Sequence, residues 1–137
     1  MRGVWRVVLA IMTASLLTGM GNLGGTPEGT VPKTEENFKA RVVDRSGVTT
    51  EVEHLSLDGK VFLEGGRGEG KITIRFRDLK EVGFGAVQGN EVAADLLFKS
   101  GEHQQLKVPK NALFYGDAGY GVFRIAAGDV SRIVFLK

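Results

Sequence analysis

The two histidines are the residues best suited to acid–base or metal chemistry. His54 follows Glu51 and Glu53, and His103 follows Glu102. An imidazole beside a carboxylate can transfer protons or bind a divalent metal, so convergence of these side chains in one cleft would indicate a small hydrolase or a metal-dependent enzyme. The sequence has no H-x-x-x-H or H-E-x-x-H spacing. We therefore expect surface histidines, no metal site and no catalytic residues.

A glycine-rich segment, Gly65 to Gly70, has the order G-x-x-G-x-G. Backbone N–H groups of such loops can surround a phosphate. Dinucleotide sites instead have the order G-x-G-x-x-G, and phosphate loops lead into a helix that this sequence does not predict. A similar segment, Gly116 to Gly121, occurs later in the chain. We interpret both as hairpin loops that need positive φ, and we expect no cofactor.

Basic side chains gather in the middle of the chain, at Lys71, Arg75, Arg77 and Lys80. Small β-barrels use such faces to bind nucleic acid. Acidic residues lie among these cations, at Glu64, Glu69, Asp78 and Glu81. We therefore expect a solvated outer face, whose charges would also discourage edge-to-edge aggregation.

Tyrosines flank the second glycine segment. Tyr115 precedes it, Tyr120 lies within it, and Asp117 lies between them. Aromatic residues on loops often form recognition surfaces, although exposed tyrosines are also ordinary residues of edge strands. We predict that Tyr115, Asp117 and Tyr120 contact a protein or glycan partner.

The first 21 residues resemble a secretory signal peptide. Arg2 and Arg6 precede an apolar run over 7–17, and the small residues Gly19 and Gly21 follow. The alternative is an uncleaved anchor, but the uncharged run over 7–20 has 14 residues and a span needs about 20. We expect cleavage near Gly21, only transient membrane contact, and a periplasmic or extracellular protein.

Removal of residues 1–21 changes the charge of the chain. The whole sequence has 18 Lys and Arg against 16 Asp and Glu. Loss of Arg2 and Arg6 leaves 16 of each, so the mature chain is formally neutral and does not predict a nucleic-acid partner. No cysteine is present, which excludes disulfides and thiolate metal sites.

After a flexible linker over 22–37, the pattern predicts an all-β protein. Apolar and polar residues alternate in short stretches between turn signals, as Ile72, Ile74 and Phe76 do, and Asp58-Gly59 favours a tight hairpin. We expect a small barrel or sandwich of about ten strands. They are Phe38–Asp44, Val48–Leu57, Val61–Leu63, Lys71–Phe76, Lys80–Phe84, Val92–Phe98, Gln104–Val108, Ala112–Tyr115, Val122–Ala126 and Val130–Leu136.

The chain also shows self-similarity. A shift of 51 residues places Gly65 on Gly116, Ile74 on Ile125 and Phe84 on Phe135, whereas Ser46-Gly47 matches Ser100-Gly101 at a shift of 54. We predict two five-stranded repeat units, 38–85 and 91–136, within one compact domain. The repeat leaves open whether the units form one sandwich or two small barrels. Asp78 and Asp129, which match each other, are expected to cap single turns.

Five short segments carry a resemblance to known proteins. They are Asp58-Gly59, the two glycine segments, Val82-Gly83-Phe84 and Ile133-Val134-Phe135. With them, residues 38–136 resemble uncharacterised exported β-repeat proteins of Gram-negative bacteria, and each unit is similar in pattern to SH3-like and Sm-like small barrels. This resemblance implies no particular activity. We expect a non-catalytic exported β module with a binding or structural role in the cell envelope.

Overall fold

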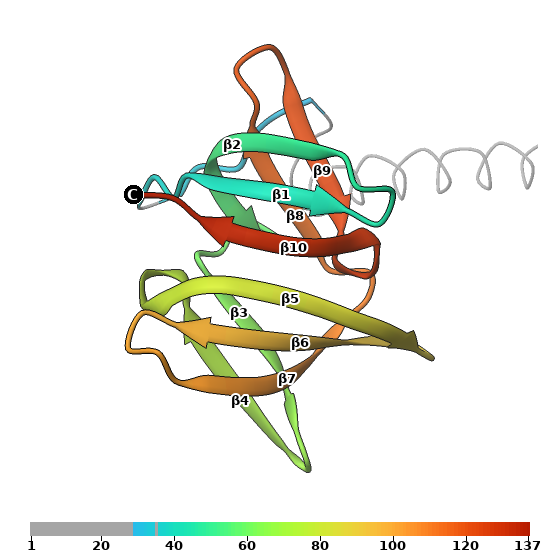
Figure 1. Ribbon diagram of the computed structural model, residues 1–137. Helices are drawn as coiled ribbons and strands as arrows, with labels where there is room; N and C mark the ends of the chain where they lie inside the picture. Colours follow the sequence, from blue (N-terminus) through green and yellow to red (C-terminus); the bar gives the residue numbers. More distant parts are fainter. Residues whose placement is uncertain (1–28, 35) are drawn as a thin grey trace, which may run out of the picture.

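A computed structural model describes residues 29–34 and 36–137 and shows one antiparallel sheet of ten strands (Figure 1). The predicted signal peptide, 1–21, lies outside the described residues, as do 22–28 and residue 35 of the predicted linker. The strands are β1 (Ala40–Asp44), β2 (Thr49–Leu57), β3 (Phe62–Arg67), β4 (Gly70–Arg75), β5 (Leu79–Gln88), β6 (Glu91–Phe98), β7 (His103–Pro109), β8 (Leu113–Asp117), β9 (Val122–Ala126) and β10 (Val130–Phe135).

The all-β prediction is confirmed, and each predicted strand corresponds to an observed one. The turn at Asp58-Gly59 is also as predicted. Both residues have positive φ, 52° and 84°, and the flanking Leu57 and Lys60 exchange two backbone hydrogen bonds. This is the two-residue hairpin connection that the Asp-Gly pair favours.

Single 3₁₀ turns, η1 (Phe76–Asp78) and η2 (Ala127–Asp129), precede β5 and β10. The prediction that Asp78 and Asp129 cap these turns was wrong, because each is the last residue of its turn. Their backbone carbonyls instead accept hydrogen bonds from the N–H groups of Lys99 and Arg45. The turns are thereby held by loops that are distant in sequence.

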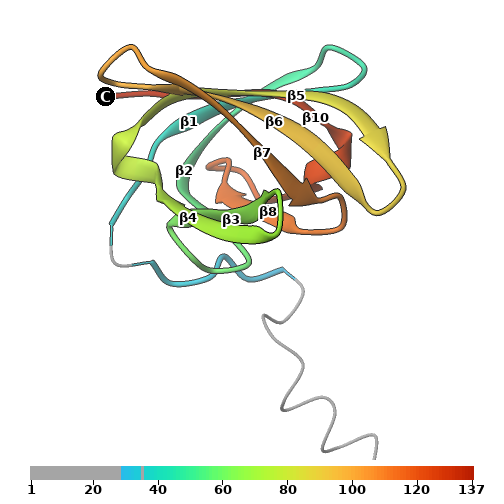
Figure 2. The same ribbon diagram turned by 90° about the horizontal axis from the view of Figure 1, so that it is seen from below.

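The strand order is β4-β3-β7-β6-β5-β10-β1-β2-β8-β9, so β4 and β9 are the two edges of the sheet. The sheet is coiled: β3, β4 and β8 form a second layer behind the one that contains β1, β5, β6 and β10 (Figure 2). The result is a half-open barrel built from one sheet, in place of two separate barrels.

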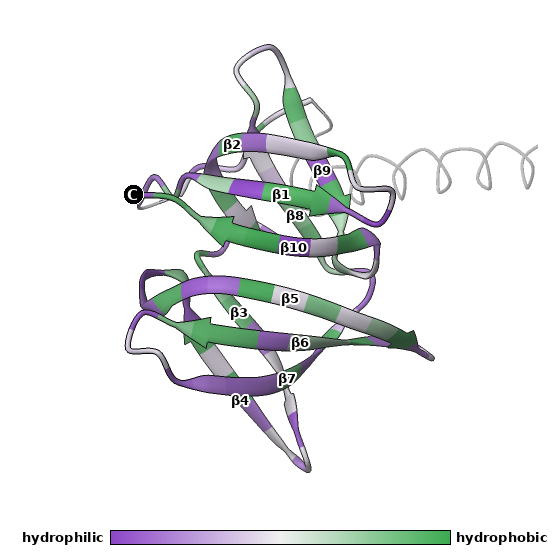
Figure 3. Ribbon diagram, in the orientation of Figure 1, coloured by the Kyte–Doolittle hydropathy of each residue, from purple (hydrophilic) through white to green (hydrophobic). Residues whose placement is uncertain are grey.

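The core lies between the two layers. Apolar and polar residues alternate along β5, β6 and β10 (Figure 3), and the buried residues of these strands are apolar, whereas Val87 near the end of β5 is 43% exposed. Phe76 contacts Phe38 and Phe135 at ring-centroid distances of 5.7 and 5.2 Å. The twelve largest side chains that are almost completely buried are Phe76, Phe114, Leu55, Leu63, Leu79, Leu96, Ile133, Val42, Val82, Val92, Val108 and Val130.

Strand registers relate the two parts of the chain by the same shifts of 51 and 54 residues. In the centre of the sheet Val82 on β5 pairs with Ile133 on β10, and these residues are 51 apart. Gly66 on β3 pairs with Lys107 on β7. A shift of 51 residues takes Gly66 to Asp117 on β8, and a shift of 54 takes Lys107 back to Glu53 on β2. Asp117 and Glu53 also pair with each other. The strand order is also symmetric about the β5–β10 pair. If β1 is exchanged with β6, β2 with β7, and so on to β5 with β10, the same order is obtained, read from the opposite edge.

Gly65 and Gly116 are the two described glycines at which an added Cβ atom would lie closest to its neighbours. A Cβ atom at Gly65 would lie 2.4 Å from the Lys107 carbonyl oxygen and 2.7 Å from Leu106 Cγ. At Gly116 it would lie 2.6 Å from Val52 Cβ. These positions therefore need glycine for the close approach of the chain.

We predict that Gly65→Ala and Gly116→Ala each lower the free energy of unfolding by about 1–3 kcal/mol, because neighbouring backbone or β-branched atoms must move. Gly83→Ala is the matched control: it lies within β5, and a Cβ there meets no atom of the described residues within 4 Å. Urea unfolding of the three variants measures the effect. Equal stability of all three would contradict the assignment.

The chain packs on the sheet before Phe38. Pro32 is buried, and its Cβ lies 3.5 Å from the position that a Cβ atom on Gly59 would take. The Asn37 side chain accepts a hydrogen bond from the His54 N–H at 2.7 Å, and Glu36 pairs with Arg77 at 3.5 Å. Part of the segment predicted as a flexible linker thus covers the sheet and shapes its surface.

Candidate functional site

The predicted contact residues do not share one exposed patch. Tyr120, at the end of the β8–β9 hairpin, is 90% exposed, whereas Tyr115 is 9% exposed. Asp117 is partly buried, and its carboxylate accepts a hydrogen bond from the Gly119 N–H at 2.8 Å. Tyr115 pairs with the buried Ser56 across β8 and β2. A partner can therefore reach Tyr120 and the rim of Asp117, but not the body of Tyr115.

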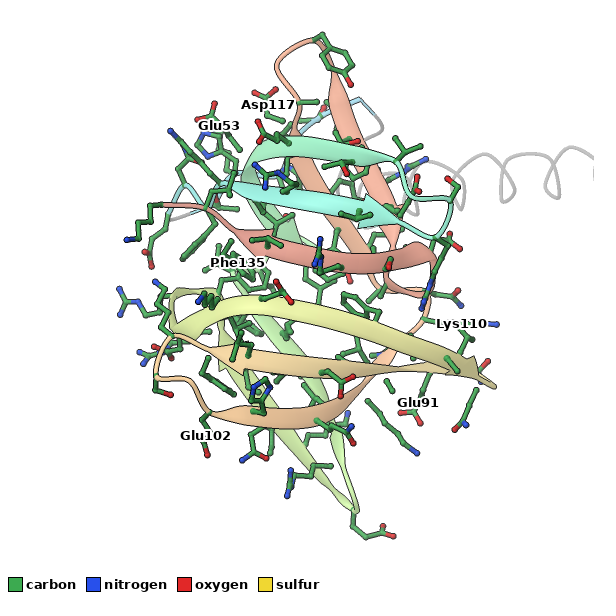
Figure 4. The ribbon with its side chains drawn as sticks, viewed as in Figure 1. Glu53, Glu91, Glu102, Lys110, Asp117 and Phe135 are labelled. Atoms are coloured by element: carbon green, nitrogen blue, oxygen red, sulfur yellow. The ribbon has the colours of Figure 1, made fainter. Side chains whose placement is uncertain are left out.

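The histidines of the hydrolase hypothesis lie in different halves of the sheet. His54 is on β2 and His103 on β7, and β6, β5, β10 and β1 lie between those strands. Figure 4 shows the same separation for the neighbouring Glu53 and Glu102. The structure therefore does not bring the two imidazoles into one cleft.

The carboxylates beside the histidines have other partners. Glu51 on β2 pairs with Arg41 on β1 at 2.9 Å, and Glu53 on β2 pairs with Lys39, the residue before β1, at 3.5 Å. His54 itself lies in a bulge with a φ of 53°. Within the described ranges no group of three or more His, Asp or Glu side chains is placed to hold a metal ion.

His103 is exposed beside an open hollow lined by Arg67, Asp95, Gln104 and Gln105. Gln104 donates a hydrogen bond to Glu102 at 3.1 Å, and Gln105 donates one to Asp95 at 2.8 Å. Each amide thus bonds one oxygen of its carboxylate.

Both glycine segments form the hairpins β3–β4 and β8–β9, which project from opposite ends of the molecule (Figure 1). Gly68 and Gly119 have positive φ, 59° and 92°, at the turns. A strand follows each loop, so neither presents the N-terminus of a helix to a phosphate. The hairpin interpretation is confirmed.

Sequence reasoning missed a cleft of about 580 Å³ between the N-terminal segment and the start of β3. Its lining combines positive side chains with aromatic rings. The lining residues are Lys33, Thr34, Glu36, Phe38, Gly59, Lys60, Val61, Phe62, Arg75 and Arg77. The cluster of Arg75 and Arg77 was visible in the sequence, but Lys33 and Phe38 join it only because the preceding segment packs on the sheet.

The described lining residues include four cations and one carboxylate, a formal surplus of three positive charges among them. Arg77 contacts Glu36 at 3.5 Å, and Arg75 contacts Asp78 outside the lining at 3.2 Å. These ion pairs are about half exposed and therefore weak. The ammonium group of Lys60 lies 5.5 Å from the ring centroid of Phe62, within the range of a cation–π interaction.

The Asp44 carboxylate stabilises the β1–β2 turn. Its Oδ1 accepts hydrogen bonds from the Ser46 hydroxyl at 2.7 Å and from the Ser46 and Val48 N–H groups, each at 2.9 Å. The Ser46 hydroxyl, followed by the Val48 N–H, holds the pKa of Asp44 below its usual value of 3.8. Ionised Asp44 therefore stabilises the fold above the pKa of the unfolded chain, and this stabilisation is lost as pH falls through the folded pKa.

We predict that Asp44→Ala lowers the free energy of unfolding at pH 7. The difference in the free energy of unfolding between the variant and the wild type should become smaller as the pH falls below about 4. Urea unfolding at several pH values measures this. Ser46→Ala, which leaves the backbone donors in place, should give a smaller loss. A difference that stays constant down to about pH 2.5 would show that the charge of Asp44 contributes nothing.

The geometry defines an all-β protein built on one coiled antiparallel sheet, with a projecting hairpin and a cationic cleft. Residues 34–137 match a protein family described as "Uncharacterised protein", and the chain belongs to that family. No curated protein and no solved structure matches the chain. Over the described residues, no helix has the length and apolar character needed to cross a membrane.

Proposed function

We propose that this protein is an exported, non-catalytic β module that binds a protein partner in the cell envelope through the end of the β8–β9 hairpin. The observation that carries the proposal is Tyr120, a large aromatic residue that is 90% exposed at the turn of a projecting hairpin. Tyrosine is among the residues that contribute most to protein interfaces, since its ring buries much surface at a small cost in side-chain entropy.

The rest of the hairpin supports this assignment. Val122, directly after the turn, is also 38% exposed, and Asp117 fixes the turn by its hydrogen bond to Gly119. The hairpin is convex, and a convex aromatic tip suits insertion into a pocket of a protein better than stacking of a glycan on a flat surface.

The neighbouring edge of the sheet also favours a protein partner. β9 and β4 are the two edge strands of the sheet. At a shift of 51 residues, Lys71 and Arg75 on β4 correspond to the uncharged Val122 and Ala126 on β9. Cations on edge strands discourage pairing with a further strand. The β9 edge has fewer of them, so it is the better edge for a strand of a partner to join.

The non-catalytic part of the proposal rests on the pairing of the candidate acids. Glu51 and Glu53 contact cations of β1 and of the residue before it, and Glu102 accepts a hydrogen bond from Gln104. His54 and His103 lie on separate strands, β2 and β7, and among the described contacts neither imidazole is paired with these carboxylates, which supports a non-catalytic role.

We predict that Tyr120→Ala reduces recovery of a specific envelope protein in affinity capture by roughly tenfold or more, the loss expected for an interface hot spot. The matched control is Glu69→Ala, because Glu69 takes the place of Tyr120 in the hairpin at the other end of the sheet. Mass spectrometry identifies the captured proteins, and thermal unfolding checks both variants. Unchanged recovery with Tyr120→Ala, or capture of glycan alone, would contradict the proposal.

The exported part of the proposal comes from residues 1–21, in which two arginines precede a short apolar run and small residues. We predict that protein isolated from the native cell begins near Asn22 and is found in the envelope or medium. Cell fractionation with N-terminal mass spectrometry tests this. Cytosolic protein that still carries residues 1–21 would contradict export and would favour the nucleic-acid alternative.

We also propose that the sheet arose by duplication of a five-stranded unit, with copies at 38–85 and 91–136. The proposal is supported by strand pairs that follow the sequence shifts. Ala40 pairs with Val52, and the residues 54 positions after them, Ala94 and Leu106, also pair with each other. Each half of the sheet combines strands of both units, for example β1 and β2 with β8, β9 and β10. The copies would thus have exchanged their hairpins and become one domain.

A further inference from the structure

We propose that the cleft between the N-terminal segment and β3 binds a small organic anion, with a phosphate or carboxylate group held by Lys60, Arg75 and Arg77 and an apolar part against Phe38 and Phe62. This site is separate from the β8–β9 hairpin and does not depend on its function. The proposal rests on three features: the charge of the cleft, its rings and the lack of its cations at the corresponding positions of the second unit.

The first feature is unused donor capacity. A guanidinium group carries five N–H donors, and the single contacts of Arg75 with Asp78 and of Arg77 with Glu36 use few of them. Both arginine side chains are more than half exposed, at 63% and 53%. They can therefore bind an anion without first losing these weak ion pairs.

The second feature is the position of the rings. Phe38 and Phe62 are half-buried and line the cleft, and Phe38 continues into the core through its edge-to-face contact with Phe76. The Lys60 ammonium lies over Phe62. An anion bound by Lys60 is therefore brought beside an apolar surface, which favours an anion attached to a ring or chain over inorganic phosphate.

The third feature is that the fold does not require these cations. At a shift of 51 residues, Lys60, Arg75 and Arg77 correspond to Asn111, Ala126 and Gly128. The second unit still forms the same hairpin and 3₁₀ turn. Positive residues that one unit carries and the other lacks are better explained by a ligand than by folding.

The second unit also has less room at the position that corresponds to Arg77. A Cβ at Gly128 would lie 3.1 Å from Lys110 Cβ and 3.3 Å from the Lys110 carbonyl oxygen, and the Gly128 N–H donates to that carbonyl. There the chain closes over the turn. In the first unit the long side chain of Arg77 and the segment around Glu36 leave an open cleft instead.

The test is titration calorimetry of the folded chain with phenyl phosphate, inorganic phosphate and phenol. Phenyl phosphate carries both the charge and the ring, so we expect it to bind about tenfold more tightly than either of the others, and more weakly as salt rises. Absence of phenyl phosphate binding at millimolar concentration would overturn the proposal. So would equal binding of phenol, which would show that the charges are not used.

The variants Lys60→Asn and Arg75→Ala introduce the residues that the second unit carries at the same places, so both should fold. We expect each to weaken phenyl phosphate binding by about tenfold. Lys107→Gln, which removes a cation of β7 outside this cleft, should have no effect. Equal loss in Lys107→Gln would show general charge attraction and overturn the site. Binding only to vesicles that contain phosphatidylglycerol would replace the small-anion site with a membrane surface.

Discussion

The pairing of β5 with β10 is the constraint on which the rest of the sheet depends, because it joins the two halves. Three residue pairs are in register there, centred on Val82 and Ile133. Both side chains are 1% exposed, so this short ladder is stabilised by burial as well as by hydrogen bonds. Each strand also pairs on its other side, β5 with β6 and β10 with β1, which fixes the position of both halves relative to the core.

Arg45 reinforces this junction from the β1–β2 turn. Its guanidinium donates hydrogen bonds to the carbonyl oxygens of Phe84 and Gly85 on β5 and to that of Gly128. The β5–β6 register shifts between Phe84 and Val87, so carbonyls in this bulge have lost partners in the ladder. One long side chain thus satisfies irregular backbone of β5 and holds the 3₁₀ turn η2.

Local patterns were sufficient to predict the strands, but not how they are ordered. Alternation and Asp58-Gly59 depend on neighbouring residues, so the sequence displays them directly. The order of strands depends on contacts such as Gly65 with Lys107, whose partners are far apart in the chain. The burial of Tyr115 was missed for a related reason: β8 is buried on both faces through Phe114, Tyr115 and Gly116, and such a strand shows no alternation.

The cationic cleft was missed because one wall comes from a segment without regular structure. Its composition predicted a linker, yet Pro32 and Asn37 attach it to the sheet beside the β2–β3 turn. Residues related by the shift of 51 thus differ at this solvent-facing cleft, whereas Gly65 and Gly116 within the sheet are the same. Gly65 and Gly116 are alike because the Lys107 carbonyl and Leu106 at one place, and the Val52 side chain at the other, leave no room for a Cβ atom. Glu69 and Tyr120, at the exposed ends of the two glycine hairpins, are free to differ, and binding surfaces commonly develop at such loop positions.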